Sequence, residues 1–236
     1  MKITRSKRHE RWLLDHIKDY LKKQPRAQGT HVSDIILPRK AYWRAIDPQP
    51  MTDHEAGYFI AGQGHHYIIE AIIEGSKKIG KADSGSHEWN GIYYSPDIKS
   101  PFPIEIKTSR ARFSPEDTGK SPAVEYDHYL NQLRSYMAID NSKRGALLVF
   151  YLSKQQGKTR RTKPEFRWWD VVLTNDAIGR LRSSLIFDKD LLEEAILQKD
   201  HMSLLLCPRW LCGDCVWLQK CKPWLLDENR EYLKEA

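Results

Sequence analysis

Three side chains that can do chemistry lie close together in the stretch SPDIKSPFPIEIKTS, residues 95–109. Glu105 and Lys107 alternate with isoleucines, so a strand at this position carries an acid and a base on one face. Asp97 precedes Glu105 by eight residues, across a segment rich in turn-forming residues. A hairpin at this position would therefore bring two carboxylates and a lysine together.

The chemistry that these residue types suggest is metal-dependent hydrolysis. Two neighbouring carboxylates repel each other unless a positive charge lies between them, and Mg²⁺ and Mn²⁺ prefer oxygen ligands. Asp97, Glu105 and the backbone carbonyl of Ile106 offer such ligands, while Lys107 can orient or deprotonate a water molecule. We therefore predict a site that hydrolyses phosphodiester bonds. The alternative is an exposed hairpin whose acid and base form an ordinary surface salt bridge.

The order of the motifs resembles that of the PD-(D/E)XK nucleases, in particular the RecB-like branch. Pro-Asp at 96–97 and Glu-Ile-Lys at 105–107 stand in the positions of the signature. Upstream, Gly62 is followed four residues later by His66, as in the RecB-type motif. The resemblance implies that His66 is a further metal ligand. Glu70, one helical turn later, could support the metal indirectly, although a solvated glutamate is the simpler interpretation.

A further element of the resemblance is the Gln-x-x-x-Tyr motif formed by Gln132 and Tyr136. Residues four apart lie on the same face of a helix. The resemblance implies that this pair contacts DNA or orients the active site, whereas the alternative is that both side chains simply face a neighbouring strand. The resemblance covers residues 30–225 and predicts the catalytic set Asp97, Glu105, Lys107, Gln132 and Tyr136.

All four cysteines of the chain fall within residues 207–221. Such clustering indicates one metal centre rather than a disulfide framework, which would spread its cysteines along the chain. The thiolates of Cys207, Cys212, Cys215 and Cys221 can hold either a zinc ion or an iron–sulfur cluster. Their spacing alone does not decide between the two.

The family resemblance favours the iron–sulfur cluster. CRISPR-associated RecB-like exonucleases end in a Cys-x2-Cys-x5-Cys triplet that binds a 4Fe–4S cluster, and Cys212, Cys215 and Cys221 match it. The fourth ligand in those proteins lies near the N-terminus, before a Pro-Arg-Lys stretch. Here Leu37 stands at that position, so the cluster cannot join the two ends of the chain through it. Cys207 is the remaining candidate for the fourth ligand.

The elements that must position these residues can be read from periodicity. We expect helices over residues 7–23, 53–74, 122–140 and 175–200, the last with a break near Phe187, and strands over 87–94, 102–108, 145–153 and 165–174. Thr52 and Glu55 predict a capping box for the second helix, and Ser33 is the expected cap of a shorter segment. A basic loop over 158–163 and a short helix after the cysteines complete the pattern.

This order of elements predicts an α/β fold with a PD-(D/E)XK core, in which helices flank a mixed central sheet, and with a small C-terminal cysteine segment. We expect one nuclease domain over residues 1–236. Its parts would be an N-terminal helical part (1–50), a catalytic core (51–175) and a helical, cysteine-containing part (176–236).

Composition narrows the classes of function. The chain has 236 residues and a net charge of +7, which is compatible with a polyanionic partner such as DNA. The longest apolar run, residues 146–152, is too short to span a bilayer, so we expect no membrane partner. No apolar segment follows the basic N-terminus, so a secretory signal is not expected and a cytoplasmic location is.

We therefore expect a Mg²⁺- or Mn²⁺-dependent DNA nuclease of the CRISPR-associated, RecB-like exonuclease type, acting on single strands or frayed ends. CRISPR integrase or recombination proteins are its expected partners. Two alternatives stay open at this point. One is a structure-selective or restriction-type endonuclease on the same core, and the other is a non-catalytic nucleic-acid-binding scaffold that kept the fold.

Overall fold

The computed structural model describes residues 7–22, 28–76, 81–82, 85–155, 162–208, 211–213 and 215–221. The short helix predicted after the cysteines lies outside these residues, as does most of the predicted basic loop. Among the described helices, none is both long and apolar enough to cross a membrane.

Within the described residues, the larger sheet has five strands in the order β2-β5-β6-β7-β8. Their bounds are Lys81–Ala82, Ile98–Ser100, Ile104–Ser109, Arg144–Gln155 and Thr162–Val172. Strands β6 and β7 run parallel, whereas the other neighbours are antiparallel. The sheet is therefore mixed, as the sequence predicted. The predicted strands over 102–108, 145–153 and 165–174 correspond to β6, β7 and β8.

A smaller sheet of three described strands corrects one prediction. The segment 87–94 was expected to be a single strand, but it forms a hairpin of β3 (His87–Trp89) and β4 (Ile92–Tyr94). Its turn contains Asn90 and Gly91, both with positive φ, 49° and 74°. An Asn-Gly pair in this conformation is the favoured two-residue hairpin turn. Strand β1 (Thr30–His31) adds to β4 in parallel.

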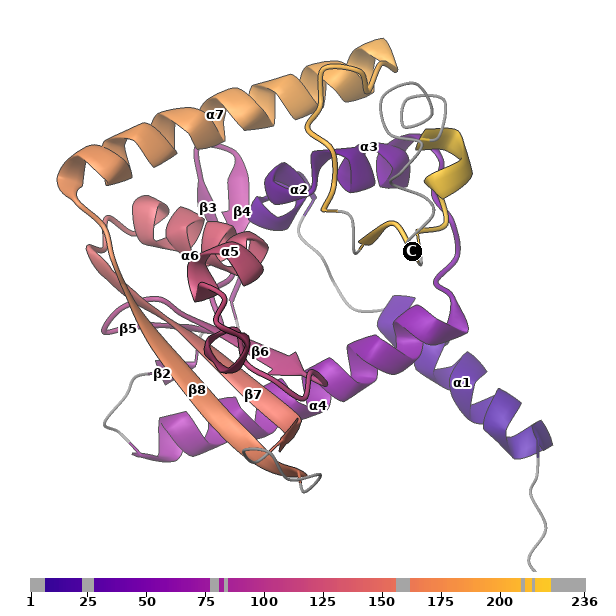
Figure 1. The fold of residues 1–236 in the computed structure, drawn as a ribbon. Helices are drawn as coiled ribbons and strands as arrows, with labels where there is room; N and C mark the ends of the chain where they lie inside the picture. Colours follow the sequence, from indigo (N-terminus) through magenta and orange to yellow (C-terminus); the bar gives the residue numbers. More distant parts are fainter. Residues whose placement is uncertain are drawn as a thin grey trace, which may run out of the picture.

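Two helices cover opposite faces of the five-stranded sheet (Figure 1). Helix α4 (Asp53–Ser76) packs Ile69 against the apolar side chains of β5, β6 and β7. Helix α6 (Asp127–Ile139) packs Leu133 and Met137 against the other face of β7. Because the isoleucines of β6 face α4, alternation turns Glu105 of that strand toward α6.

The remaining helices differ from prediction in three places. Residues 122–140 form two helices, α5 (Pro122–Glu125) and α6, with a break at Tyr126, whose φ and ψ are −109° and 23°. Helix α7 (Asn175–Gln198) is continuous, so the predicted break near Phe187 is wrong. Its buried residues Ile178, Leu185 and Leu192 recur every seven positions, and this regular spacing keeps one face of a single helix on the core.

The N-terminal helices are α1 (Lys7–Lys22), α2 (Val32–Ile36) and α3 (Pro38–Ile46), and η1 (Glu116–Thr118) is a single 3₁₀ turn. The capping box of α4 is confirmed: Thr52 N donates to Glu55 Oε2 over 2.9 Å, and Glu55 N donates to Thr52 Oγ1 over 3.1 Å. Ser33 is not a cap, because α2 begins one residue earlier and His31 precedes it as the N-cap.

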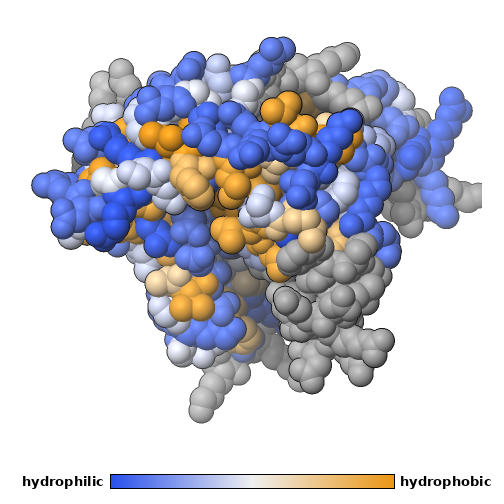
Figure 2. All heavy atoms as spheres, turned by 90° about the horizontal axis from the view of Figure 1, so that it is seen from above, coloured by the Kyte–Doolittle hydropathy of each residue, from blue (hydrophilic) through white to orange (hydrophobic). Residues whose placement is uncertain are grey.

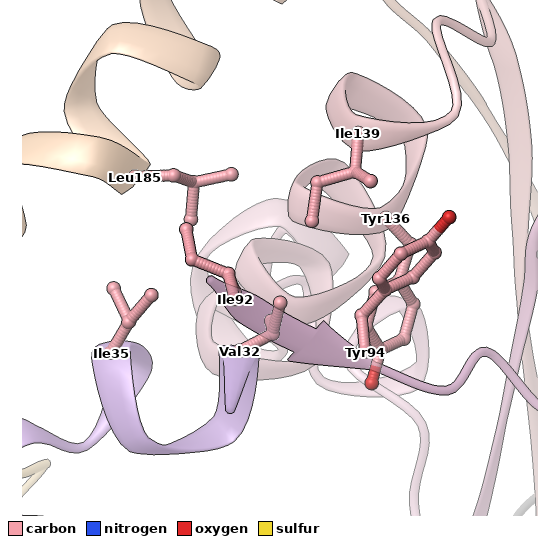
Figure 3. Close-up of a cluster of buried hydrophobic side chains, with 7 residues drawn as sticks. All are labelled: Val32, Ile35, Ile92, Tyr94, Tyr136, Ile139 and Leu185. Atoms are coloured by element: carbon pink, nitrogen blue, oxygen red, sulfur yellow. The ribbon is translucent and has the colours of Figure 1, made fainter. Parts of the chain in front are cut away.

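A second apolar core joins α2, β4, α6 and α7 (Figure 3). It consists of Val32, Ile35, Ile92, Tyr94, Tyr136, Ile139 and Leu185. In this cluster Tyr136 of α6 lies beside Tyr94 of β4, with ring centroids 6.1 Å apart. The packing fixes α6 with respect to the small sheet, and so fixes the side chains that α6 turns toward β6.

The face formed around α7 is mainly hydrophilic with several apolar patches (Figure 2). Exposed apolar residues on α7 and the segment after it include Phe187, Leu197 and Leu205. Exposed apolar side chains are common on globular proteins, so these residues alone do not indicate a partner.

Candidate active site

The β5–β6 hairpin brings Asp97 next to β6, as the sequence predicted. Asp97 immediately precedes β5, whose Ile98 pairs with Ile104 of β6. The Asp97 Oδ2 atom accepts a hydrogen bond of 2.6 Å from the backbone N–H of Ile106. In a strand, the N–H and C=O of one residue point to the same side. The carbonyl of Ile106 therefore points toward the edge of β6 on which Asp97 lies.

Glu105 is a buried acid rather than a surface one. Its side chain is only 1% exposed, and its Oε1 accepts a hydrogen bond from Lys107 Nζ. Its Oε2 is buried and has no hydrogen-bond partner among the described residues. Burial raises the pKa of Glu105 to about 7, and the positive charge of Lys107 offsets only part of this. The alternative of an exposed hairpin with a surface salt bridge is therefore wrong.

Lys107 stays positively charged at this site. Removal from water would lower the pKa of its ammonium group, but the negative charges of Glu105 and Asp97 outweigh this effect and raise it. Its side chain is 20% exposed, so solvent reaches part of it. A cation in this position can face an anionic substrate.

Helix α4 supplies two further ligand groups beside Asp97. Ligand atoms of His66, Glu70 and Asp97 all lie within 4.8 Å of one another, and His66 Nδ1 is 3.6 Å from Asp97 Oδ1. Burial disfavours the Asp97 carboxylate, but nearby His66 and Lys107 outweigh this and lower its pKa. Glu70 thus belongs to the site rather than to the solvated surface that the sequence suggested. Its position four residues after His66 was the available signal.

These residues fit a divalent cation. Two carboxylates and an imidazole converge, and Glu105 interacts electrostatically with both Asp97 and His66. An uncompensated oxygen in a buried carboxylate costs free energy unless a proton or a cation is supplied. The orphaned Oε2 of Glu105 therefore marks a position where a cation would be stabilising, and the mainly oxygen ligands suit Mg²⁺ or Mn²⁺.

Helix α6 turns the Gln132–Tyr136 pair toward β6. Gln132 Nε2 donates a hydrogen bond of 2.7 Å to the Tyr136 hydroxyl, and Tyr136 is only 4% exposed. Its pKa lies well above the ordinary value, first because it is buried and second because Glu105 is close. Of the two roles that the resemblance implied, contact with DNA and orientation of the active site, the burial of Tyr136 favours orientation.

Tyr129 is a site residue that the sequence reasoning missed. Its ring centroid lies 5.4 Å from Lys107 Nζ, a distance typical of a cation–π contact. Tyr129 precedes Gln132 by three residues and Tyr136 by seven, so all three share one helix face. The neighbouring His128 does not add a competing charge near Lys107, because burial lowers its pKa to about 4.

We predict that the aromatic ring of Tyr129, rather than its hydroxyl, holds Lys107 in place. A Tyr129→Phe variant should keep kcat within about twofold of wild type, because the ring face remains. A Tyr129→Leu variant should lower kcat about tenfold with little change in KM, since a cation–π contact contributes about 1–2 kcal/mol. Steady-state hydrolysis of a DNA strand by both variants tests this. Equal losses in the two variants would instead assign the effect to the hydroxyl.

The four cysteines are neighbours near α3. All four are half-buried free thiols. Burial, together with the negative charge of the other three thiolates, raises the pKa of the Cys207 thiol. They are more widely spaced than the ligands of the active site, since no three of them lie within 4.8 Å of one another in the described part of the chain.

Although residue 37 is not a cysteine, other contacts join the N-terminal helices to the cysteine segment, residues 207–221. Trp43 Nε1 lies 2.9 Å from Cys221 Sγ, to which it donates, and Trp217 Nε1 donates to the Asp47 carbonyl over 2.9 Å. The buried Arg39 donates from Nε to the Leu204 carbonyl over 2.9 Å. The Pro-Arg-Lys stretch thus packs beside the thiols although Leu37 replaces the expected ligand.

Comparison with known proteins gives similarity of fold. The chain matches no protein-family model, and it matches no curated protein. It resembles the crystal structure of a protein designated SSO0001, with a TM-score of 0.55, 18% identity, and coverage of 90% of this chain and 96% of the other. It also resembles an alkaline exonuclease, LHK-Exo, from Laribacter hongkongensis, with a TM-score of 0.50, 12% identity, and coverage of 78% and 95%.

A phage-related exonuclease from Haemophilus somnus 129PT gives a TM-score of 0.49 at 12% identity, over 74% of this chain and 98% of the other. At such identities the likeness concerns the fold alone. The predicted fold class is confirmed in that the chain is mixed α/β, with helices flanking a mixed sheet, and shares its fold with the alkaline exonuclease.

Proposed function

We propose that this chain is a metal-dependent deoxyribonuclease that hydrolyses phosphodiester bonds from single-stranded or frayed ends. The observation that carries the proposal is the buried Glu105, whose Oε2 has no hydrogen-bond partner among the described residues and whose carboxylate interacts electrostatically with Lys107, Asp97 and His66. A buried carboxylate oxygen without a hydrogen-bond partner costs free energy, and a bound metal ion would compensate it. The likeness of fold to an alkaline exonuclease supports the same activity.

Each residue has a definite task in this proposal. Asp97, Glu105, His66 and the Ile106 carbonyl would hold Mg²⁺ or Mn²⁺, with Glu70 as an additional ligand. A bound cation of this kind makes water more acidic and offsets the charge on phosphoryl oxygens. Lys107, held between Glu105 and Tyr129, presents its ammonium to the phosphate and can orient the attacking water by donating a hydrogen bond to it. Tyr136, which packs beside Tyr94 of β4, would keep α6 and hence Tyr129 in position, and Gln132 would orient the Tyr136 hydroxyl.

We further assign the chain to the RecB-like, CRISPR-associated type of nuclease. The support is the order of motifs: His66 after Gly62, then Asp97, then Glu-Ile-Lys at 105–107, then Gln132 with Tyr136. CRISPR integrase or recombination proteins are the partners that this assignment suggests.

We also propose that the four cysteines form a metal centre with a structural role. Burial raises the pKa of the Cys207, Cys212 and Cys221 thiols, and four thiolates gathered beside α3 would repel one another unless a cation compensated them. We propose that Cys207, Cys212, Cys215 and Cys221 hold a 4Fe–4S cluster, with zinc as the alternative. Because the segment contacts α3 rather than β6, its task is to fasten the C-terminal part of the chain onto the N-terminal helices.

The end-directed character can be tested with linear and circular single strands of the same sequence. With Mn²⁺, the protein should degrade the linear strand to short products and leave the circle intact. The circle has no end to enter the site, so its survival is the expected result. Cutting of both substrates at equal rates would favour the endonuclease alternative, and nicking confined to duplex junctions would favour a structure-selective enzyme.

A further inference from the structure

Helix α4 turns one more side chain toward the same side as its two metal-site residues. Phe59 precedes His66 by seven residues and Glu70 by eleven, which are about two and about three helical turns. The three side chains therefore project from one face of the helix. His66 and Glu70 occupy this face at the candidate metal site, so Phe59 continues the face toward the N-terminal end of α4.

The Phe59 ring is not part of the core. It is 45% exposed, whereas Ile69 on the sheet-covering part of the same helix is 6% exposed. The C-terminal half of α4 packs against the sheet, and the N-terminal half extends past the sheet toward α1 (Figure 1). A large exposed aromatic ring beside a catalytic site is more informative than a scattered aliphatic residue.

The helix surface between Phe59 and His66 carries the exposed Gln63 on one side and has no side chain at Gly62 on the other. Gly62 lies there, and a Cβ atom added to it would meet no atom within 4 Å. Among the described residues, no side chain therefore covers the helix at Gly62. This leaves room for a ligand beside Gly62, between the metal site and the Phe59 ring.

We propose that Phe59 is a stacking subsite for a base of the single strand whose phosphate is at the metal site. This inference rests on the proposed nuclease function and adds a substrate contact to it. Seven residues of helix span about 10 Å, which corresponds to about three nucleotides of a stacked strand or fewer of an extended one. Aromatic rings bind bases of single strands without sequence preference.

A nucleic acid fits this surface better than a second copy of the chain. The ring shares its helix face with the groups proposed to act on phosphate, and the chain carries a net charge of +7. The adjacent Ile60 offers a matched control: it is 40% exposed, but it is turned by about 100° around the helix from Phe59. A general apolar contact would use both side chains, whereas a stacking subsite would use only Phe59.

The test measures binding separately from cleavage. Fluorescence anisotropy with a labelled 12-nucleotide single strand, in EDTA, should show about tenfold weaker binding for Phe59→Ala, given the usual contribution of one base–aromatic stack. Phe59→Tyr, which keeps the ring, and Ile60→Ala should each stay within about twofold of wild type. A mononucleotide bound at the metal site is too short to reach the ring, so its affinity should be the same for all four proteins.

Unchanged affinity in Phe59→Ala, with hydrolysis intact, would overturn the subsite while leaving the nuclease proposal standing. Equal weakening in Phe59→Ala and Ile60→Ala, together with a change in molecular mass by light scattering, would assign the face to contact between copies of the chain. If the wild-type protein neither bound nor hydrolysed single strands, both the subsite and the nuclease function would fail.

Discussion

A Glu105→Gln variant should lose hydrolysis of DNA by about a thousandfold or more while its fold is retained. Glutamine keeps the shape of the side chain but removes the charge that would bind the cation and pair with Lys107. Metal-assisted stabilisation of a phosphoryl transition state contributes several kcal/mol, and each 1.36 kcal/mol corresponds to a factor of ten in rate. Initial rates with Mn²⁺ measure the loss directly.

Thermal unfolding separates this effect from a damaged fold. Glu105 has a pKa of about 7 in the folded protein against an ordinary value of 4.5. An acid with a raised folded pKa costs stability as the pH rises through this range, because the unfolded chain ionises first. In EDTA, Glu105→Gln should therefore gain stability relative to wild type between about pH 5 and pH 7.

Added Mn²⁺ should stabilise wild type relative to Glu105→Gln, which is the opposite of the effect expected in EDTA. A ligand that binds only the folded state raises the melting temperature, so Mn²⁺ should stabilise wild type and not Glu105→Gln. Glu88→Gln, on the exposed surface of β3, is the matched control and should behave as wild type. A Glu105→Gln protein that still hydrolysed DNA at the wild-type rate would show that this acid is not a catalytic ligand.

The second large effect is expected at the cysteines. Cys212→Ser or Cys221→Ser should lower the melting temperature by about 10 °C, since a bound metal centre contributes several kcal/mol to folding and 1 kcal/mol shifts a chain of this size by about 2–4 °C. Wild-type protein purified without oxygen should be brown and contain iron with acid-labile sulfide. Both variants should lack the colour.

Two further variants define the centre. Val216→Ala changes an exposed side chain next to Cys215 and should keep both colour and stability. Cys207→Ser should lose the cluster if this residue replaces the ligand that Leu37 does not provide. A colourless protein with one zinc ion per chain would overturn the iron–sulfur assignment but not the nuclease assignment, and a protein with neither metal would remove the proposed structural role.

Local patterns predicted much of the fold because they depend on neighbouring residues. The alternation around Glu105 predicted β6, and the Thr52–Glu55 pair predicted the start of α4. The Asn90–Gly91 turn was equally local, and its signal for a hairpin was available in the sequence. The prediction of a single strand over 87–94 was wrong because this turn signal was overlooked, although the sequence contained it.

The burial of the site could not be predicted in the same way. Glu105 is buried because α6, whose residues begin more than twenty positions later, covers its face of the sheet. The contact between Lys107 and Tyr129 has the same origin. Glu70 joins His66 and Asp97 only once α4 is placed against the hairpin. Such contacts depend on how distant segments pack, which periodicity does not encode.

The most direct test of the central claim follows hydrolysis of a linear single strand through removal and return of the metal. We expect release of short nucleotides with Mn²⁺, no release after EDTA, and recovery of hydrolysis when Mn²⁺ is restored in excess. Circular dichroism should stay constant throughout, because the cation completes the site rather than the fold. Hydrolysis that continued in EDTA would contradict the proposal of a metal-dependent nuclease. A strand left intact by folded protein with Mn²⁺ bound would contradict it as well.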